Sequence, residues 1–337
     1  MSTIASTAPP APRARGAARA TRRSPWLGWI GRRLVQLALG VVFVATAAFF
    51  ILRLLPGDPA RTIAGVDARP ETVAHLRASL GLDRSLPAQY VSYLGDVARL
   101  DFGQSFSSHR DVTALIGDRL LGTLLLAGLA CAVMLVVGVA VGMVAGAATE
   151  GGRRPRVEMA FGFGNGLLAS LPEFVTGVFL VYVFGVTLGW LPIAGRGGPD
   201  SWVLPVLALA IAPTAALARI VRLETVRVLA TDYVRAARGH RLPARLLYLR
   251  HALPNLLTSA LTIGGLLFAG LLGSTVVVEN VFAWPGLGTL VVEAIETRDY
   301  PVIEGAVFVL GVMVLVINTL VDAALAWLDP RLLTETA

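Results

Sequence analysis

Residues 120–148 read LLGTLLLAGLACAVMLVVGVAVGMVAGAA, and this stretch contains no charged residue. Residues 252–278 form a second charge-free stretch of comparable length. A helix needs about 20 mostly apolar residues to cross the hydrocarbon core of a bilayer. Both stretches are therefore typical of membrane-spanning helices.

The composition of the whole chain agrees with this interpretation. The chain has 337 residues, of which 55% are hydrophobic and 15% charged, and its mean hydropathy is +0.70. A soluble domain cannot bury so much apolar surface, so we predict an all-α integral membrane protein. Six segments are long enough to span a membrane: 34–55, 120–148, 159–190, 202–221, 253–279 and 304–327. The third contains Pro172, where we expect a kink or a helix start.

Arginine distribution predicts the orientation of these spans. All 29 basic residues are arginines, and with six spans 19 of them fall on the side of the N-terminus. The opposite segment 56–119 carries seven arginines against eight acids. Because cytoplasmic loops are enriched in basic residues, both termini are expected in the cytoplasm of a bacterial plasma membrane.

The same reasoning divides the chain into regions. Residues 1–30 are rich in Ala, Pro and Arg, and we expect a disordered cytoplasmic arm. Residues 31–330 form the six-span domain. Within it, 56–118 is an extracytoplasmic insertion with helix-like stretches at 71–80 and 87–100, and 222–252 is a cytoplasmic loop. Residues 331–337 form a cytoplasmic tail.

The content of lysine, cysteine and histidine argues against catalytic, cofactor or metal sites in this chain. No lysine occurs, which excludes a Gly-Lys-Ser/Thr phosphate loop and a Schiff-base lysine. Cys131 is the single cysteine, and the four histidines have no metal-ligand spacing. The arginines near the N-terminus suit an anionic lipid surface better than nucleic acid. We therefore predict no catalytic residue, cofactor or metal site, and expect another subunit to hydrolyse any ATP.

The positions of acidic residues near the spans argue against ion-coupled transport. Glu173, Glu279 and Asp322 lie close to predicted interruptions or span ends, where we expect solvation at the membrane interface. A proton- or sodium-driven carrier usually needs carboxylates at mid-depth. Their scarcity disfavours ion-coupled transport.

The segment 219–250 carries eight arginines and two acids between two spans. From Tyr233 onward its pattern allows a short amphipathic helix, with Val234, Ala237 and Leu242 on one face and arginines on the other. Pro243 would end or restart that helix. Charge alone does not decide between a docking surface and a loop whose arginines merely set the topology.

This segment resembles the EAA loop of bacterial ABC-importer permeases, most closely those of the dipeptide, oligopeptide and nickel group. The glycine of that loop would fall at Arg241, whereas this chain has Gly239. Further stretches resemble the same family in the same order: LLPGDP at 54–59, DFGQS at 101–105, LGWLP at 188–192, ENVFAWPGLG at 279–288 and RDYP at 298–301.

The resemblance implies a fold, a function and partners. The fold would be the six-span type I ABC importer transmembrane domain, and the function a permease subunit forming half of a pathway for short peptides. An extracytoplasmic binding protein would deliver the substrate, a second and different permease chain would complete the pathway, and two ATPase subunits would bind ATP and Mg. Nickel or glutathione import stays open within the family, and a stand-alone carrier or channel is the alternative outside it.

The resemblance also assigns residues. A coupling helix that contacts the ATPase would comprise Asp232, Tyr233, Val234, Arg235, Ala236, Ala237, Arg238, Gly239, His240 and Arg241. Candidate gate or bend residues are Pro172, Gly264 and Gly265, because proline and glycine mark bends in membrane helices. Gly138, Gly142 and Gly146 recur every four residues, a spacing that favours close helix packing.

Overall fold

The computed structural model describes residues 25–54, 59–64, 68–79, 81–152, 154–240, 243 and 246–328. Over these ranges the chain is almost wholly helical, and the β structure found there is an isolated bridge between Gln104 and Asp111. Five helices are long and apolar enough to span a membrane, and a bent pair would make a sixth span. The prediction of an all-α membrane protein is confirmed.

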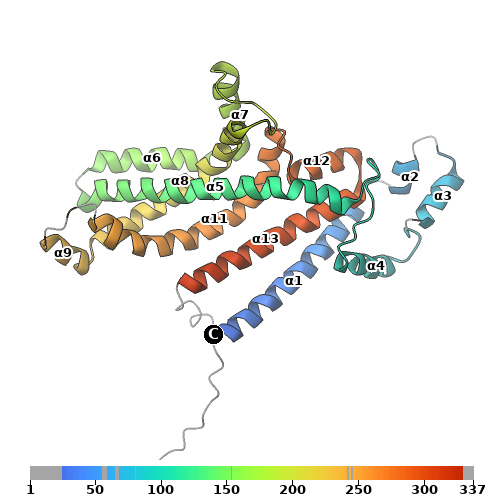
Figure 1. Cartoon of the computed structure of the whole chain (residues 1–337), viewed down its shortest axis with the longest axis horizontal. Coiled ribbons are helices and arrows are strands. Elements are labelled where there is room, and N and C mark those ends of the chain that lie inside the picture. Colours follow the sequence, from blue (N-terminus) through green and yellow to red (C-terminus); the bar gives the residue numbers. More distant parts are fainter. Residues whose placement is uncertain are drawn as a thin grey trace, which may run out of the picture.

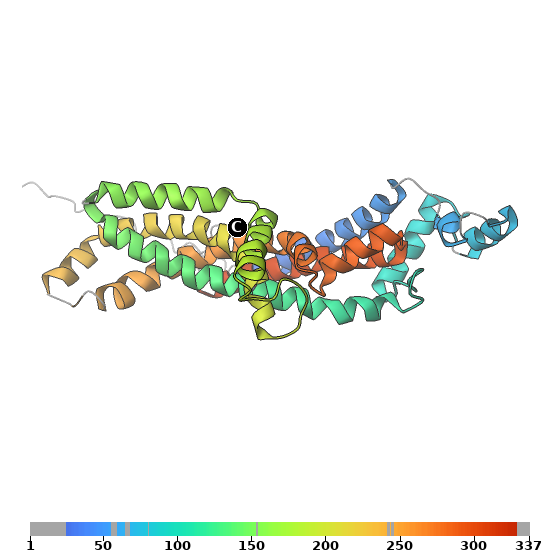
Figure 2. The same cartoon turned by 90° about the horizontal axis from the view of Figure 1, so that it is seen from above.

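The elements follow one another along the chain in the order α1 (Pro25–Leu54), α2 (Pro59–Ala64), α3 (Pro70–Ser79), α4 (Leu86–Ala98), α5 (Val112–Thr149), η1 (Glu150–Gly152), α6 (Pro155–Ser170), α7 (Glu173–Leu180), η2 (Val181–Thr187), η3 (Pro199–Trp202), α8 (Val203–Leu229), α9 (Asp232–Gly239), η4 (Leu247–Ala252), α11 (Leu253–Val281), α12 (Leu287–Thr297) and α13 (Tyr300–Leu328). The long helices run roughly along one direction, with α9 at one end and α2, α3 and α4 toward the other (Figure 1, Figure 2). We call these the α9 end and the α4 end.

Two helices extend beyond the predicted spans into charged sequence. Helix α8 continues to Leu229, so residues 222–229 are helical rather than part of a loop. Charge does not stop it because Arg222 pairs with Glu158, and Arg227 pairs with Glu224 at 2.6 Å. Helix α5 begins at Val112, where the Asp111 carboxylate accepts a hydrogen bond of 3.1 Å from the Thr113 N–H.

The ends of the chain also differ from expectation. Residues 25–30, assigned above to the disordered arm, form the first turns of α1. Proline is favoured at the first position of a helix, where its missing N–H costs nothing, and Pro25 stands there. Residues 1–24 and the predicted tail 331–337 lie outside the described residues.

The chain bends by 96° between α6 and α7, and Figure 1 shows α7 leaving the bundle there. Leu171 is extended, with ψ at 124°, because the ring of the following proline disfavours a helical conformation. Pro172 then caps α7, and its carbonyl accepts a hydrogen bond of 3.0 Å from the Thr176 N–H. The expected interruption of the third span is therefore a sharp bend.

Helices α5 and α8 are packed with little space between them. A Cβ atom on Gly142 would lie 2.6 Å from the carbonyl oxygen of Ala218, and one on Gly146 would lie 2.5 Å from Cβ of Thr225. One on Gly138 would lie 3.0 Å from Cδ2 of Leu217. The four-residue glycine spacing thus marks the face of α5 that meets α8, as predicted.

The α4 end contains the predicted insertion, whose helices α3 and α4 match the stretches expected at 71–80 and 87–100. Tyr90 of α4 shares a hydrogen bond of 2.7 Å with Thr46 of α1. Its neighbour Gln89 accepts one of 2.9 Å from Arg53, while Tyr93 packs on Phe49. Helix α4 is therefore fastened to the end of α1.

Candidate functional site

Helix α9 lies at one end of the bundle, between α8 and η4, and spans most of the predicted coupling residues. The backbone enters it through Thr231, whose carbonyl accepts a hydrogen bond of 3.1 Å from the Arg235 N–H. Asp232 in the first turn and Arg238 in the last turn both complement the helix dipole. Gly239 ends the helix without a positive φ, and Arg241 lies outside the described residues.

One face of α9 packs against the chain's own bundle. Val234 is 0% exposed and Ala237 is 8% exposed. They form an apolar cluster with Leu229 at the end of α8 and Leu247 in η4. The predicted amphipathic pattern is confirmed for Val234 and Ala237, while Leu242 falls outside the described residues.

The opposite face of α9 is exposed. The side chain of Asp232 is 96% exposed and that of Arg235 is 68% exposed, and the two form an ion pair at 3.4 Å. Ala236, Gly239 and His240 are exposed as well. This face, which we call the outward face of α9, consists of Asp232, Arg235, Ala236, Gly239 and His240.

Two polar links fix the orientation of α9. Arg238 donates from Nη1 to Oε1 of Glu150 at 2.7 Å and from Nη2 to Oε2 at 2.9 Å. The hydrogen bond from Arg238 to Glu150 raises the pKa of the arginine. On the other side, Asn255 of α11 donates a hydrogen bond of 2.7 Å to the Tyr233 hydroxyl. Helix α9 is thus tied both to the end of α5 and to the start of α11.

Arg222 of α8 forms a further link near this end of the bundle. Its Nε donates a hydrogen bond of 3.2 Å to Oγ1 of Thr149 on α5, and its Nη2 pairs with Glu158 on α6. Since its side chain is 13% exposed, this arginine is held between three helices. The ends of α5, α6 and α8 are therefore joined directly beside α9.

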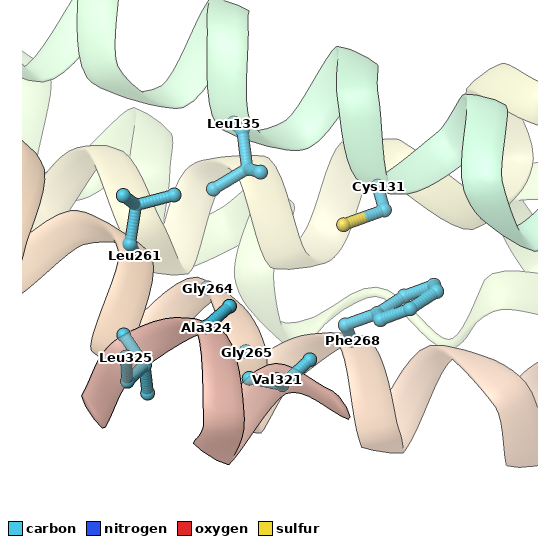
Figure 3. A pocket seen from close by; sticks show the side chains of 9 residues that line it. All are labelled: Cys131, Leu135, Leu261, Gly264, Gly265, Phe268, Val321, Ala324 and Leu325. Atoms are coloured by element: carbon cyan, nitrogen blue, oxygen red, sulfur yellow. The ribbon is translucent and has the colours of Figure 1, made fainter. Parts of the chain in front are cut away.

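The candidate gate glycines lie inside α11, which passes them without a break. A Cβ on Gly264 would lie 2.5 Å from Cδ2 of Leu135 on α5, and one on Gly265 would collide with Val321 on α13. They line an apolar pocket of about 130 Å³ that also contains Cys131 and Phe268 (Figure 3). Both glycines allow helices to approach closely, and their role in gating stays a prediction.

The expectation that Glu279 is solvated at a span end is wrong. This residue is 0% exposed, and its carboxylate accepts hydrogen bonds from the Thr123 hydroxyl and the Gly288 N–H. A Cβ on Gly286 or Gly288 would crowd that carboxylate. The glycines of the ENVFAWPGLG stretch were the available signal, because an acid followed by small residues can fold back onto its own backbone.

Asp299 is a second structural residue that the sequence reasoning missed. The Ser105 hydroxyl donates to Oδ2 at 2.6 Å and the Ser107 hydroxyl at 2.8 Å, while the Phe106 N–H donates to Oδ1 at 3.1 Å. Burial alone raises the pKa of Asp299, but the hydrogen bonds from these residues outweigh it, so the pKa lies below its usual value. The DFGQS and RDYP stretches are therefore in contact.

Among the residues that the structure describes, no group of His, Cys, Asp and Glu could hold a metal ion. The α9 end of the bundle presents an exposed helix face. A short helix is anchored on one side and carries exposed polar groups on the other.

Comparison with known proteins assigns the family. Residues 138–334 match the family described as "Binding-protein-dependent transport system inner membrane component", and residues 26–127 match its N-terminal counterpart. The chain belongs to this family. It is 39% identical over 309 residues to the glutathione transport system permease protein GsiC of Pectobacterium atrosepticum, and the match covers 91% of this chain and 99% of that protein. It is 37% identical over 307 residues to GsiC of Escherichia coli K12, with the same coverage.

Family membership settles the general function. The protein is the permease subunit of an ABC importer with the type I transmembrane fold, and it is a multi-pass protein of the inner membrane. It works with a substrate-binding protein and with partner subunits that hydrolyse ATP. The family assignment favours this function over a stand-alone carrier or channel.

Proposed function

We propose that the outward face of α9 is the surface on which a partner ATPase subunit docks. The observation that carries this proposal is the two-sided character of α9. Its apolar face is packed into the permease, whereas its charged face at the end of the bundle is exposed. Arg235 on this face pairs with Asp232 of the same helix and donates a hydrogen bond of 2.8 Å to the carbonyl of nearby Ala230. The segment also resembles the EAA loop.

Because α9 is fixed to the bundle on one side, it can transmit a force that a bound partner applies to its other side. A rigid short helix that is seated in a partner and fixed to the bundle passes on a rigid-body movement, a common element of conformational switches. ATP and Mg would be bound by two ATPase subunits, and their closure would move α9 together with the helices to which it is tied. The permease itself would bind no cofactor.

The orientation follows from the arginines. We place the α9 end and both termini in the cytoplasm, because basic residues concentrate in the segments on that side. The α4 end would then face the binding protein. A cysteine introduced at exposed Arg99 beside α4 should react with a membrane-impermeant thiol reagent in whole spheroplasts, and one introduced at exposed Arg235 should react only after the membrane is opened. The opposite labelling pattern would show that the proposed orientation is wrong.

A second permease chain is expected to complete the pathway. Helices α6 and α7 expose large apolar side chains, among them Met159, Phe163, Phe174 and Phe179. Helix α7 is also bent by 96° relative to α6. We propose that this surface packs against a related but different permease. Co-expression with candidate partners, followed by mass measurement of the purified complex, would show whether the pair is mixed.

The proposed substrate is a short peptide, with glutathione the first compound to test. The relatives are named for glutathione transport, and glutathione is itself a tripeptide. Few charges line the spans, so we expect the permease to make weak contacts with its substrate and the binding protein to supply the specificity.

The decisive experiment alters only the outward face of α9. Arg235→Glu with Ala236→Glu should abolish co-purification of the ATPase and ATP-dependent glutathione uptake, while membrane insertion stays normal. Arg99→Glu, an exposed charge change beside α4, is the matched control and should keep the ATPase bound. Ala237→Glu is unsuitable because Ala237 is packed inside the permease. An unchanged complex in the double variant would refute the assignment.

A further inference from the structure

We propose that the Glu150–Arg238 ion pair is the link that carries movement of α9 into α5, so that both residues position the coupling helix for transport. This inference rests on the proposed docking of the ATPase on α9. It adds two specific residues and a route into the bundle.

The geometry of the pair is specific. Both carboxylate oxygens of Glu150 accept hydrogen bonds, at 2.7 and 2.9 Å, from two nitrogens of one guanidinium. Such a two-point contact fixes the relative direction of two groups, as a single hydrogen bond does not. The side chains are 39% and 23% exposed for Arg238 and Glu150, so the pair is partly shielded from water. It joins segments 88 residues apart in sequence.

The ion pair connects α9 to α5 because of where Glu150 lies in the chain. Glu150 directly follows the last residue of α5, whereas the apolar contacts of α9 are with the end of α8 and with η4. The ion pair therefore connects α9 to a third element. After Glu150 the chain turns through Gly151 and Gly152, with φ at 66° and 67°, and this turn separates α5 from α6.

Helix α5 is built to carry such a movement. It runs 38 residues from Val112 to Thr149, and its glycine face is seated against α8. Gly142 and Gly146 bring the backbones of α5 and α8 into close contact. We therefore expect a displacement of α5 to be passed on to α8. A displacement of Glu150 would thus reach Thr123 and the α12 contacts near the other end of α5.

The test uses the complete importer with its ATPases and binding protein in liposomes. Glu150→Arg and Arg238→Glu each place like charges together and separate α9 from α5. Couplings between sites typically amount to about 5- to 150-fold. We expect each single reversal to lower binding-protein-stimulated ATP hydrolysis and glutathione uptake about fivefold, at the lower end of that range. The ATPase should remain bound in both.

The exchange of both charges decides between coupling and simple damage. Glu150→Arg combined with Arg238→Glu re-forms the pair and should restore most of the stimulated hydrolysis, since only interacting residues show such non-additivity. Glu224 and Arg227 are the matched control, because they form an ion pair within α8 alone. Reversal of either control residue should leave stimulation unchanged, because this exposed pair lies within one helix and exposed pairs of this kind contribute little.

Each contrary outcome has a distinct meaning. Unchanged coupling in the single reversals, or failure of the exchange to restore it, overturns this inference and leaves the docking proposal standing. Release of the ATPase by Arg238→Glu but not by Glu150→Arg would show that Arg238 contacts the ATPase, which also overturns it. A bound ATPase in the outward-face variant would instead refute the docking proposal. If the reversed singles do not fold, Glu150→Gln and Arg238→Gln must show the same coupling loss with normal melting.

Discussion

The hydroxyl of Thr123 donates a hydrogen bond of 2.6 Å to the carboxylate of Glu279, although 156 residues separate them. The second carboxylate oxygen accepts a hydrogen bond of 2.6 Å from the Gly288 N–H. Thr123 in turn accepts one of 2.8 Å from the Leu287 N–H. These bonds join α5, α11 and the start of α12 in a place without solvent, where an unpaired donor is costly.

Glu279→Gln tests this junction. The new amide group cannot accept from both donors, so one of them loses its partner, at a cost of about 1–3 kcal/mol. We expect a lower melting temperature of the purified permease. Glu293→Gln, an exposed acid on α12, is the control and should melt like the parent. Equal melting of the two variants would mean that the junction contributes little.

Gly146→Ala tests the packing of α5 on α8. The added methyl group would lie 2.5 Å from Cβ of Thr225 and 2.9 Å from the Arg222 carbonyl, so the backbones must move apart. Such overpacking costs about 1–3 kcal/mol. Gly128→Ala is a matched control in the same helix, because its Cβ would meet no atom within 4 Å. Thermal melting should separate the two, and a similar value for both would argue against tight contact.

Asp299→Asn tests the contact between segment 101–111 and the start of α13. Loss of the charged acceptor should destabilise the protein by about 1.5–3 kcal/mol at pH 7. Because the folded pKa lies below the unfolded value of about 3.9, the parent's advantage is complete above that pH and is lost as the pH falls through the folded pKa. Melting temperatures of parent and variant should therefore converge below pH about 4. A constant difference would contradict this prediction, and exposed Asp118→Asn is the control.

Pro172→Ala tests the bend as a gate element. Without the proline ring, Leu171 can adopt a helical conformation, so α6 and α7 can straighten toward a continuous helix. We expect slower ATP-dependent uptake with the ATPase still bound. Pro155→Ala is the control, since Pro155 occupies the first position of α6, where no helix hydrogen bond is lost. Normal uptake in Pro172→Ala would remove Pro172 from the candidate gate residues.

The inside face of α9 could be predicted, but its attachment could not. Val234 and Ala237 lie three positions apart, and helical periodicity alone places them on one side. That side packs against Leu229 of α8 and Leu247 of η4, and only the tertiary structure shows that these two residues lie there. The hydrogen bonds from Arg238 to Glu150 could not be predicted either, because nothing in the sequence around one residue identifies the other as its partner.

Local sequence determined the membrane segments of this protein, since bilayer thickness sets how long a charge-free helix must be. It also determined the glycine face of α5 and the bend at Pro172, both of which follow from backbone sterics. Only the tertiary structure decided where charged residues belong. Arg222 stays inside a helix, Glu279 is buried and Asp299 receives hydrogen bonds from Ser105, 194 residues away. The physical reason is that a charge is tolerated or excluded according to its partners, and distant segments supply those partners.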